Sequence, residues 1–241
     1  MAKKEKVVPE EVAQDGAPAE KKRKKKWPIV LGTVVAVIAV AVVGFLVWHE
    51  QPSFCNAICH MPMDPYLPTY EATPGEASTD KWGNEVADAS GMLAAVHRVA
   101  GEEAGSKITC MSCHVPTLSE QIGEGISWIS GDYEVLANDT WGGVLQERDL
   151  ETLVTARGLD SGDEFCLNPD CHDFTRSDLI QLTSKYTRNP HVAQHSTLTC
   201  DSCHKAHRAS VNACSQCHSD APIPDGWLTV AEEKKLESTA N

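Results

Sequence analysis

Aromatic residues are scarce in this sequence: Phe, Trp and Tyr together make up only 6% of its 241 residues. The hydrophobic fraction is 41%, and a single apolar run near the N-terminus accounts for part of it. A core built from side chains alone would therefore be thin for a chain of this length. Alternating polar and apolar runs, which would indicate strands, are also missing. The sequence thus predicts a mainly α-helical protein with little regular structure, whose interior is filled by something other than side chains.

Positively charged residues are few beyond residue 48 and are outnumbered by acidic ones. The first 48 residues contain nine Lys and Arg and five Asp and Glu, whereas the remainder contains 12 and 29, a net charge of −17. A domain this acidic is poorly suited to a phosphate backbone, so no nucleic acid is expected as a partner. A protein partner with a basic docking patch is expected instead.

Charged residues are also absent from Pro28 to Trp48, a run of 21 residues. A helix of this length crosses a hydrocarbon core of about 30 Å, and Trp27 and Trp48 stand where interfacial tryptophans anchor a span. The basic cluster from Lys21 to Lys26 predicts that the N-terminus is cytoplasmic and that residues 49–241 lie outside. A cleaved signal peptide is the alternative, but its apolar run would be shorter. We therefore expect a single-pass signal anchor in the cell membrane.

Cysteine is missing from the first fifty residues, and ten cysteines follow in five close pairs, each with a histidine directly after its second member. The form Cys-x-x-Cys-His is the attachment motif of c-type haem. Its two thiols bond to the porphyrin vinyl groups, and its histidine is held beneath the iron as the proximal ligand. Three pairs have this spacing: Cys110, Cys113 and His114; Cys200, Cys203 and His204; and Cys214, Cys217 and His218.

The other two pairs have longer gaps. Three residues separate Cys55 from Cys59 before His60, and four separate Cys166 from Cys171 before His172. A longer loop can bulge while the thiols stay at the vinyl positions, so both pairs are also expected to hold haem. A disulfide is the alternative for each, because the outside of the membrane is oxidising. Zinc is another, although zinc ribbons need no histidine after each second cysteine.

The sequence thus predicts five covalently attached haem c groups, and at least three. Five haems would use all ten cysteines. Stacked haems would then supply the interior that the scarce aromatic side chains do not.

Five histidines lie outside the motifs, and four of them are candidates for the sixth, distal iron ligand. His207 is too close in sequence to His204 to wrap around the same macrocycle, so it should reach a neighbouring haem. Two others would share one face if their segment were helical. His49 lies at the membrane boundary and is expected to be structural. The four predicted distal ligands are His97, His191, His195 and His207.

The first haem needs a different sixth ligand, and two methionines follow His60 directly. Methionine sulfur on iron raises the reduction potential relative to two imidazoles. Met63 is the expected ligand, whereas Met61 is expected to pack against the porphyrin. An open coordination position on this iron is the remaining alternative.

The sequence predicts four parts. These are a disordered basic cytoplasmic tail (1–26), the transmembrane signal anchor (27–48), an extracytoplasmic multihaem cytochrome c domain (49–218) and a C-terminal tail (219–241). Apolar residues at three- and four-residue spacing predict short helices outside the anchor. The expected helices are Leu118–Ser130, Val144–Arg157, Ser177–Thr187 and Thr229–Ser238.

The anchor, the first motif just outside it, and the run Cys110-Met-Ser-Cys113-His114-Val115-Pro116 resemble membrane-anchored cytochromes of the NapC/NirT family. This resemblance covers residues 27–135. It implies transfer of electrons from quinol to reductases outside the membrane, with a methionine on the first haem, for which Met63 is the counterpart. Beyond about residue 160, the run from Cys200 to His207 together with His191 and His195 resembles tetrahaem cytochrome domains, which often feed flavin-containing reductases.

Some positions depart from the NapC/NirT pattern. That family usually has two residues within its first motif and its methionine two residues past the histidine, where this chain has Pro62. Its members tend to carry a lysine a few turns after the second motif, but no lysine occurs here between His114 and Lys185. Lys107 is the candidate substitute. Asp132 and Glu124 are candidate proton acceptors for quinol oxidation.

The expected function is electron transfer in anaerobic respiration, from menaquinol or a similar quinol to a flavin- or haem-containing reductase outside the membrane. The protein would then be an electron carrier with quinol dehydrogenase activity. One alternative is a multihaem reductase that reduces a small substrate at an open-coordinate haem. Another is a downstream relay that does not touch quinol.

Overall fold

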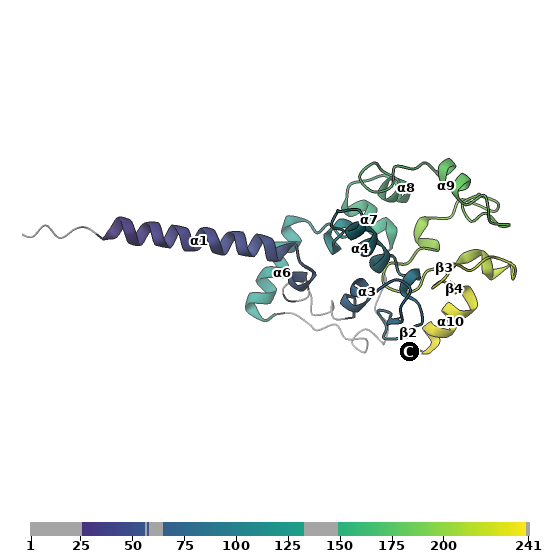
Figure 1. Cartoon of the computed structure of the whole chain (residues 1–241), viewed down its shortest axis with the longest axis horizontal. Coiled ribbons are helices and arrows are strands. Elements are labelled where there is room, and N and C mark those ends of the chain that lie inside the picture. The colour runs from purple at the N-terminus through teal and green to yellow at the C-terminus, as the bar shows by residue number, and fades with distance from the viewer. Residues whose placement is uncertain (1–25, 56, 58–64, 133–148, 240–241) are drawn as a thin grey trace, which may run out of the picture. The chain divides into compact units, whose positions relative to one another are not determined.

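The computed structural model describes residues 26–55, 57, 65–132 and 149–239 (Figure 1). The chain divides into two compact units, residues 1–44 and 45–241. Most of the predicted tail, together with Cys59, His60 and the two methionines after it, lies outside the described residues.

Helix α1, Trp27–His49, is the predicted apolar segment. Its residues are apolar on every face and none of them is buried within the protein, which suits a helix surrounded by lipid rather than by a protein core. Among the described residues it is the one helix long and apolar enough to cross a membrane, with a mean hydropathy of 2.9. It is therefore a candidate membrane anchor.

The second unit is built from short helices with very little sheet, which confirms the predicted fold class. Two pairs of two-residue strands are hydrogen-bonded, β1 with β2 antiparallel and β3 with β4 parallel. The strands are Ser78–Thr79, Glu85–Val86, Val211–Asn212 and Leu228–Thr229. The α-helices are α2 Pro52–Phe54, α3 Leu67–Glu71, α4 Leu93–Glu103, α5 Cys110–Cys113, α6 Leu118–Ser130, α7 Leu150–Ala156, α8 Gly162–Cys166, α9 Arg176–Leu182 and α10 Val230–Thr239. Single 3-10 turns are η3 Ala89–Gly91, η4 Cys200–Ser202 and η5 Ala213–Gln216.

Side-chain caps explain where several helices begin. Thr117 accepts the backbone N–H of Glu120, whose carboxylate in turn accepts the N–H and the hydroxyl of Thr117. This capping box starts α6 at the predicted residue, and Gly131 ends it with a φ of 72°, a value that suits glycine. Thr175 forms the same kind of capping box with Asp178 at the start of α9, and the Asp149 carboxylate caps α7 by accepting the backbone N–H of Thr152.

Two predicted helices differ from the structure in length. The predicted helix Ser177–Thr187 is too long, because α9 ends at Leu182. The Thr183 hydroxyl donates to the carbonyl of Leu179 at 2.6 Å, and the Asn189 amide donates to the carbonyl of Ile180 at 2.7 Å. Side chains thus satisfy the last carbonyls and the helix does not continue. In the predicted helix 144–157, residues 149–157 contain the seven-residue α7, and the rest lies outside the described residues.

The hydrophobic core of the second unit is thin, as the composition predicts. One cluster gathers small side chains around Met92, which is fully buried. The other packs Leu150 and Val154 of α7 against Phe165 of α8. Clusters of this size bury little apolar area, so interactions other than side-chain packing must order the domain.

The C-terminal residues pack onto this same unit. Leu228 donates its N–H to the carbonyl of Ser210 at 2.8 Å, within the β3–β4 pairing. Arg208, whose side chain is only 6% exposed, forms a 2.7 Å ion pair with Glu233 of α10 and lies over the ring of Trp82. The predicted domain boundary at residue 218 stays a prediction. The contacts of Leu228 and Glu233 show that residues beyond this boundary pack on the residues before it.

We expect the replacement Glu233→Gln to lower the free energy of unfolding by about 2–3 kcal/mol, because Arg208 would keep a buried charge without a carboxylate beside it. Urea unfolding of the detergent-solubilised protein, followed by far-UV circular dichroism, measures this. Glu151→Gln, at an exposed position on α7, is the control and should change stability by about 0.5 kcal/mol or less. Equal midpoints for the two variants would contradict the stabilising role of the pair.

Candidate haem-binding sites

The three two-residue motifs share one local fold. In each, the N–H of the histidine donates to the carbonyl of the first cysteine, at 2.9 Å for His114, 3.0 Å for His204 and 2.9 Å for His218. Each motif is therefore a single helical turn. Residues three apart in such a turn lie on one side of it, so both thiols face the same way, as attachment to one porphyrin requires.

The four-residue gap of the third motif is a compact turn. Cys166 ends α8, and the Cys171 N–H donates to the carbonyl of Asn168 at 3.0 Å. The Asn168 amide bridges the carbonyls of Glu164 and Phe165 at 3.1 and 3.0 Å. The four intervening residues therefore form a hydrogen-bonded turn that joins the end of α8 to Cys171. Of the first motif only Cys55 and Ala57 are described.

Thiols of successive motifs contact each other. Cys55 is hydrogen-bonded to Cys110, which lowers the pKa of the Cys55 thiol to about 7 and raises the pKa of Cys110. Cys166 and Cys200 form a second contact of this kind, which raises the pKa of Cys166 and lowers that of Cys200 to about 7. None of the described cysteines is part of a disulfide. The contacts place the first motif beside the second and the third beside the fourth.

Motif histidines meet the predicted distal histidines in pairs. The ring centroids of His114 and His207 are 6.3 Å apart with an interplanar angle of 19°. Those of His195 and His218 are 6.2 Å apart at 18°. His97 faces His172 at 5.9 Å and 55°. In the described part of the chain, no group of three or more His, Cys, Asp or Glu side chains is arranged to hold a metal ion directly.

These spacings fit a haem iron between the rings. Metal–nitrogen bonds to imidazole are about 2.0–2.1 Å long, so two rings that bind opposite sides of one metal have centroids about 6 Å apart. A second observation also fits haem. The Nε of Arg157 is buried without a hydrogen-bond partner, and its charge acts on the nearby Cys113 thiol. An acidic group such as a haem propionate would satisfy it.

Burial keeps several of these imidazoles neutral. It lowers the pKa of His172 and His191, and it lowers the pKa of His204 to about 4. The charges of His191, His97 and His172 contribute to the lowered pKa of His204 after burial, which is the largest cause. A neutral imidazole is the form that binds a metal. His204 also meets the ring of Trp227 edge-on at 5.0 Å.

The segment around His191 and His195 is not helical but a series of turns. The two residues therefore do not share a helix face. His195 stacks on His218, whereas the ring of His191 lies 3.1 Å from the Thr183 hydroxyl. His49, expected to be structural, packs against Phe54 with ring centroids 4.8 Å apart.

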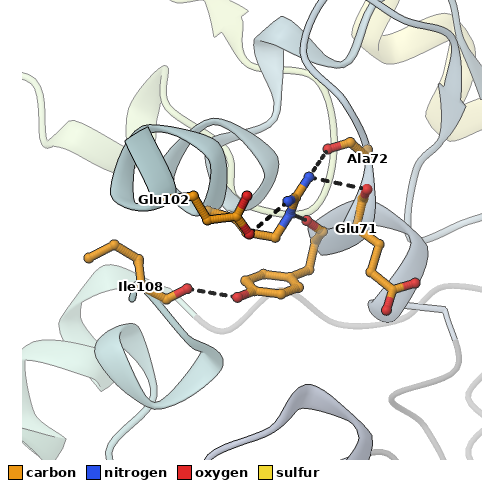
Figure 2. Close-up of polar contacts among 6 residues, drawn as sticks. Glu71, Ala72, Glu102 and Ile108 are labelled. Atoms are coloured by element: carbon orange, nitrogen blue, oxygen red, sulfur yellow. Dashed lines mark hydrogen bonds and ion pairs between the residues drawn. The ribbon is translucent and has the colours of Figure 1, made fainter. Parts of the chain in front are cut away.

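An arginine clamp, shown in Figure 2, positions the helix that carries His97. Arg98 of α4 donates to the carbonyls of Tyr70, Glu71 and Ala72 at 2.8, 3.3 and 3.0 Å, and to the Glu102 carboxylate at 3.0 Å. The clamp thus binds α4 to the end of α3. The hydroxyl of the same tyrosine donates to the carbonyl of Ile108 at 2.7 Å, just before the second motif. No sequence signal marked this arginine.

Two polar side chains considered for a quinol site lie near the first motif. Lys107 donates to the carbonyl of Glu50, immediately after α1, at 3.5 Å. Glu124 of α6 is close enough to Cys55 for its charge to oppose ionisation of that thiol. Asp132 lies beyond the end of α6, and its N–H donates to the carbonyl of Ser127 at 3.0 Å.

Helix α6 carries an exposed apolar stripe. The sequence periodicity predicted the helix but not the exposure of this face. Four of its apolar side chains are 54% to 80% exposed. Their spacing of three and four residues puts them on one face of the helix. They are Leu118, Ile122, Ile126 and Ile129.

Known proteins that resemble this chain are cytochromes. A family model described as Cytochrome c3 matches residues 154–219, which contain the third, fourth and fifth motifs. The cytochrome c-type protein Cgr1 of Eggerthella lenta is 55% identical over 231 residues, covering 96% of this chain and 99% of that protein. No solved structure matches.

We expect Arg98→Gln to lower the free energy of unfolding by about 1–3 kcal/mol, because three backbone carbonyls, two of them in partly buried hydrogen bonds, would lose their donor. Glu102→Gln removes only the exposed ion pair and should cost about 0.3–0.5 kcal/mol. Urea unfolding of the two variants under identical conditions checks the difference. The clamp would have no structural role if both variants unfolded at the same urea concentration.

Proposed function

Because the chain belongs to the c-type cytochrome family of Cgr1, we propose that it is a membrane-anchored pentahaem cytochrome that carries electrons from menaquinol or a similar quinol to a reductase outside the membrane. The observation that carries the proposal is the set of histidine pairs, each of which brings a motif histidine opposite a second imidazole at a spacing that suits one iron. Six-coordinate iron suits electron transfer better than substrate binding.

Covalent haem gives the protein its redox chemistry, a one-electron iron couple at each site. The residues of the chain set where that chemistry happens. The ten cysteines of the motifs would hold five macrocycles, the five motif histidines would be proximal ligands, and buried imidazoles would be distal ligands. Met63 would be the sulfur ligand of the first site, although it lies outside the described residues.

Quinol oxidation is proposed for the region where α1 ends. Quinol releases two electrons and two protons as it becomes quinone, so the site needs proton acceptors as well as a nearby oxidant. Glu124 lies beside Cys55, and Lys107 lies beside the residue that follows α1. The exposed apolar stripe of α6 suits the entry of a lipid-soluble quinol. These features support membership of the NapC/NirT type despite the missing family lysine.

The orientation of the protein in the membrane is inferred from its distribution of charged residues. The basic cluster before α1 favours a cytoplasmic N-terminus, so the haem domain would lie outside and the quinol protons would be released there. The net charge of −17 beyond residue 48 favours a partner with a basic docking patch. Binding to such a partner would be weak and sensitive to salt. A flavin- or haem-containing reductase is the partner class proposed.

Intact-mass measurement of the denatured protein should give the mass of the chain plus five haems. Replacing both cysteines of the first motif with alanine, or both of the third, should remove one haem each, because those thiols form the thioethers. Three haems and two disulfides, each lighter by two hydrogens, would instead assign the longer-spaced pairs to disulfide bonds. The disulfide outcome would overturn the pentahaem proposal.

Anaerobic spectroscopy tests quinol oxidation. A menaquinol analogue added to membranes should reduce most of the haem rapidly, as seen in the reduced α-band. Glu124→Gln should slow this reduction by about tenfold or more, because the quinol would lose a proton acceptor. Lys107→Gln and Met63→Ala should also slow it.

Matched controls are Glu151→Gln and Lys185→Gln, in the later motif-bearing part of the chain, and neither should affect the rate. Dithionite measures the total reducible haem in every sample. Full reduction by dithionite without reduction by quinol would show a downstream relay rather than a quinol oxidase.

A further inference from the structure

The pairing of rings extends to a fourth site by elimination. Among the predicted ligands, three motif histidines each face one distal histidine (His114 with His207, His172 with His97, and His218 with His195). His204 and His191 are the motif histidine and the distal histidine that remain, so elimination pairs them. Every distal histidine is then used once.

The hydrogen bonds of the distal rings determine which nitrogen remains for a metal. The Thr69 hydroxyl donates to the carbonyl of Tyr66 at 2.6 Å, so its oxygen can only accept from the Nδ1 of His207, 2.8 Å away. The proton of His207 is therefore on Nδ1, and Nε2 is the unprotonated nitrogen, the one able to bind a metal. Thr69 is fully buried, which holds this arrangement in place.

Two other distal rings have the same tautomer. The Nδ1 of His97 lies 2.8 Å from the carbonyl of Leu93, to which it can only donate. The Thr183 hydroxyl lies 2.6 Å from the carbonyl of Leu179 and 2.7 Å from the Asn189 amide oxygen, and therefore accepts from the Nδ1 of His191 at 3.1 Å. A ligand histidine typically donates its second N–H to such a partner, which orients the ring.

We propose that His207, His97, His191 and His195 bind the irons of the haems whose proximal ligands are His114, His172, His204 and His218 respectively. The first three bind through Nε2, and Thr69 and Thr183 are positioning residues that hold the rings of His207 and His191. The assignment rests on the haem attachment proposed above. With this assignment, each of these irons would link two separate segments of the chain.

Double variants test each pairing. His97→Ala should convert one haem to the five-coordinate, high-spin ferric state, seen by electron paramagnetic resonance, and added imidazole should restore the low-spin state. Combining it with Cys166→Ala and Cys171→Ala, which remove the third haem, should abolish the high-spin signal. Combining it with Cys214→Ala and Cys217→Ala should leave the signal intact.

The opposite pattern, with the signal lost together with the fifth haem, would overturn the pairing. The corresponding double variants test the other three distal histidines. Intact mass is measured on each sample, so that a wrong haem count, which would contradict the proposed function, is distinguished from a wrong ligand pair. Trp227→Phe is the packing control, because it alters the contact edge-on to His204 without removing a ligand, and it should leave all haems low-spin.

Single variants with all haems attached give a second test if the haem-deficient ones do not fold. Nearly parallel ligand planes give a rhombic low-spin signal, whereas strongly tilted planes give a signal with one very large g value. The 55° pair predicts that His97→Ala removes the large-g signal, and the 18° pair predicts that His195→Ala removes a rhombic one. The reverse result would overturn both assignments.

The positioning role of the threonines has its own readout. Thr69→Val should leave five haems attached but make the second one bind imidazole or carbon monoxide at least tenfold faster, because His207 would lose its orienting acceptor. Thr69→Ser keeps the hydroxyl and should restore the slow rate. The positioning role is wrong if valine and serine behave alike.

Discussion

The meeting of imidazole rings from separate segments is the spatial constraint that the proposed haem sites impose on the second unit. Its two described apolar clusters are small, and one of them is rich in alanine. The ring pairs join α4 to the third motif, the second motif to the loop after the fourth, and the 191–195 turns to the fifth. An iron between each pair would supply a strong directional bond where the side-chain core is weakest. The short helices and strands would then serve mainly to position the histidines that bind iron.

Sequence patterns reached the local chemistry but not the long-range geometry. Cysteine spacing and trailing histidines identified the motifs, and apolar spacing predicted α6 to the residue. The Thr117 capping box and Gly131 explain why the helix has those ends. Which distal ring meets which motif was not predictable, because no local rule relates His97 to a histidine in the third motif. The end of α9 was missed for a related reason: the Asn189 side chain that terminates it lies outside the helix.

The Arg98 clamp and Thr69 were missed because their importance comes from what they touch. An arginine or threonine in isolation carries no positional signal, yet Arg98 binds three carbonyls of the neighbouring segment and Thr69 sets the tautomer of a ring 138 positions away. Side chains of this kind become visible only when burial and hydrogen-bond direction are known. The same holds for the apolar stripe of α6, whose pattern predicts a face but not its exposure.

The separation between Thr69 and His207 also constrains how the protein is made. If the haem domain lies outside the membrane as proposed, the residues after α1 would cross in sequence order. The second motif would then reach the outside before residue 207, and the site it shares with His207 would stay incomplete until that residue had crossed. Haem ligation machinery would therefore act on an extended chain rather than on a folded one. Folding of this cytochrome domain is thus expected to be completed late, once its C-terminal third has crossed the membrane.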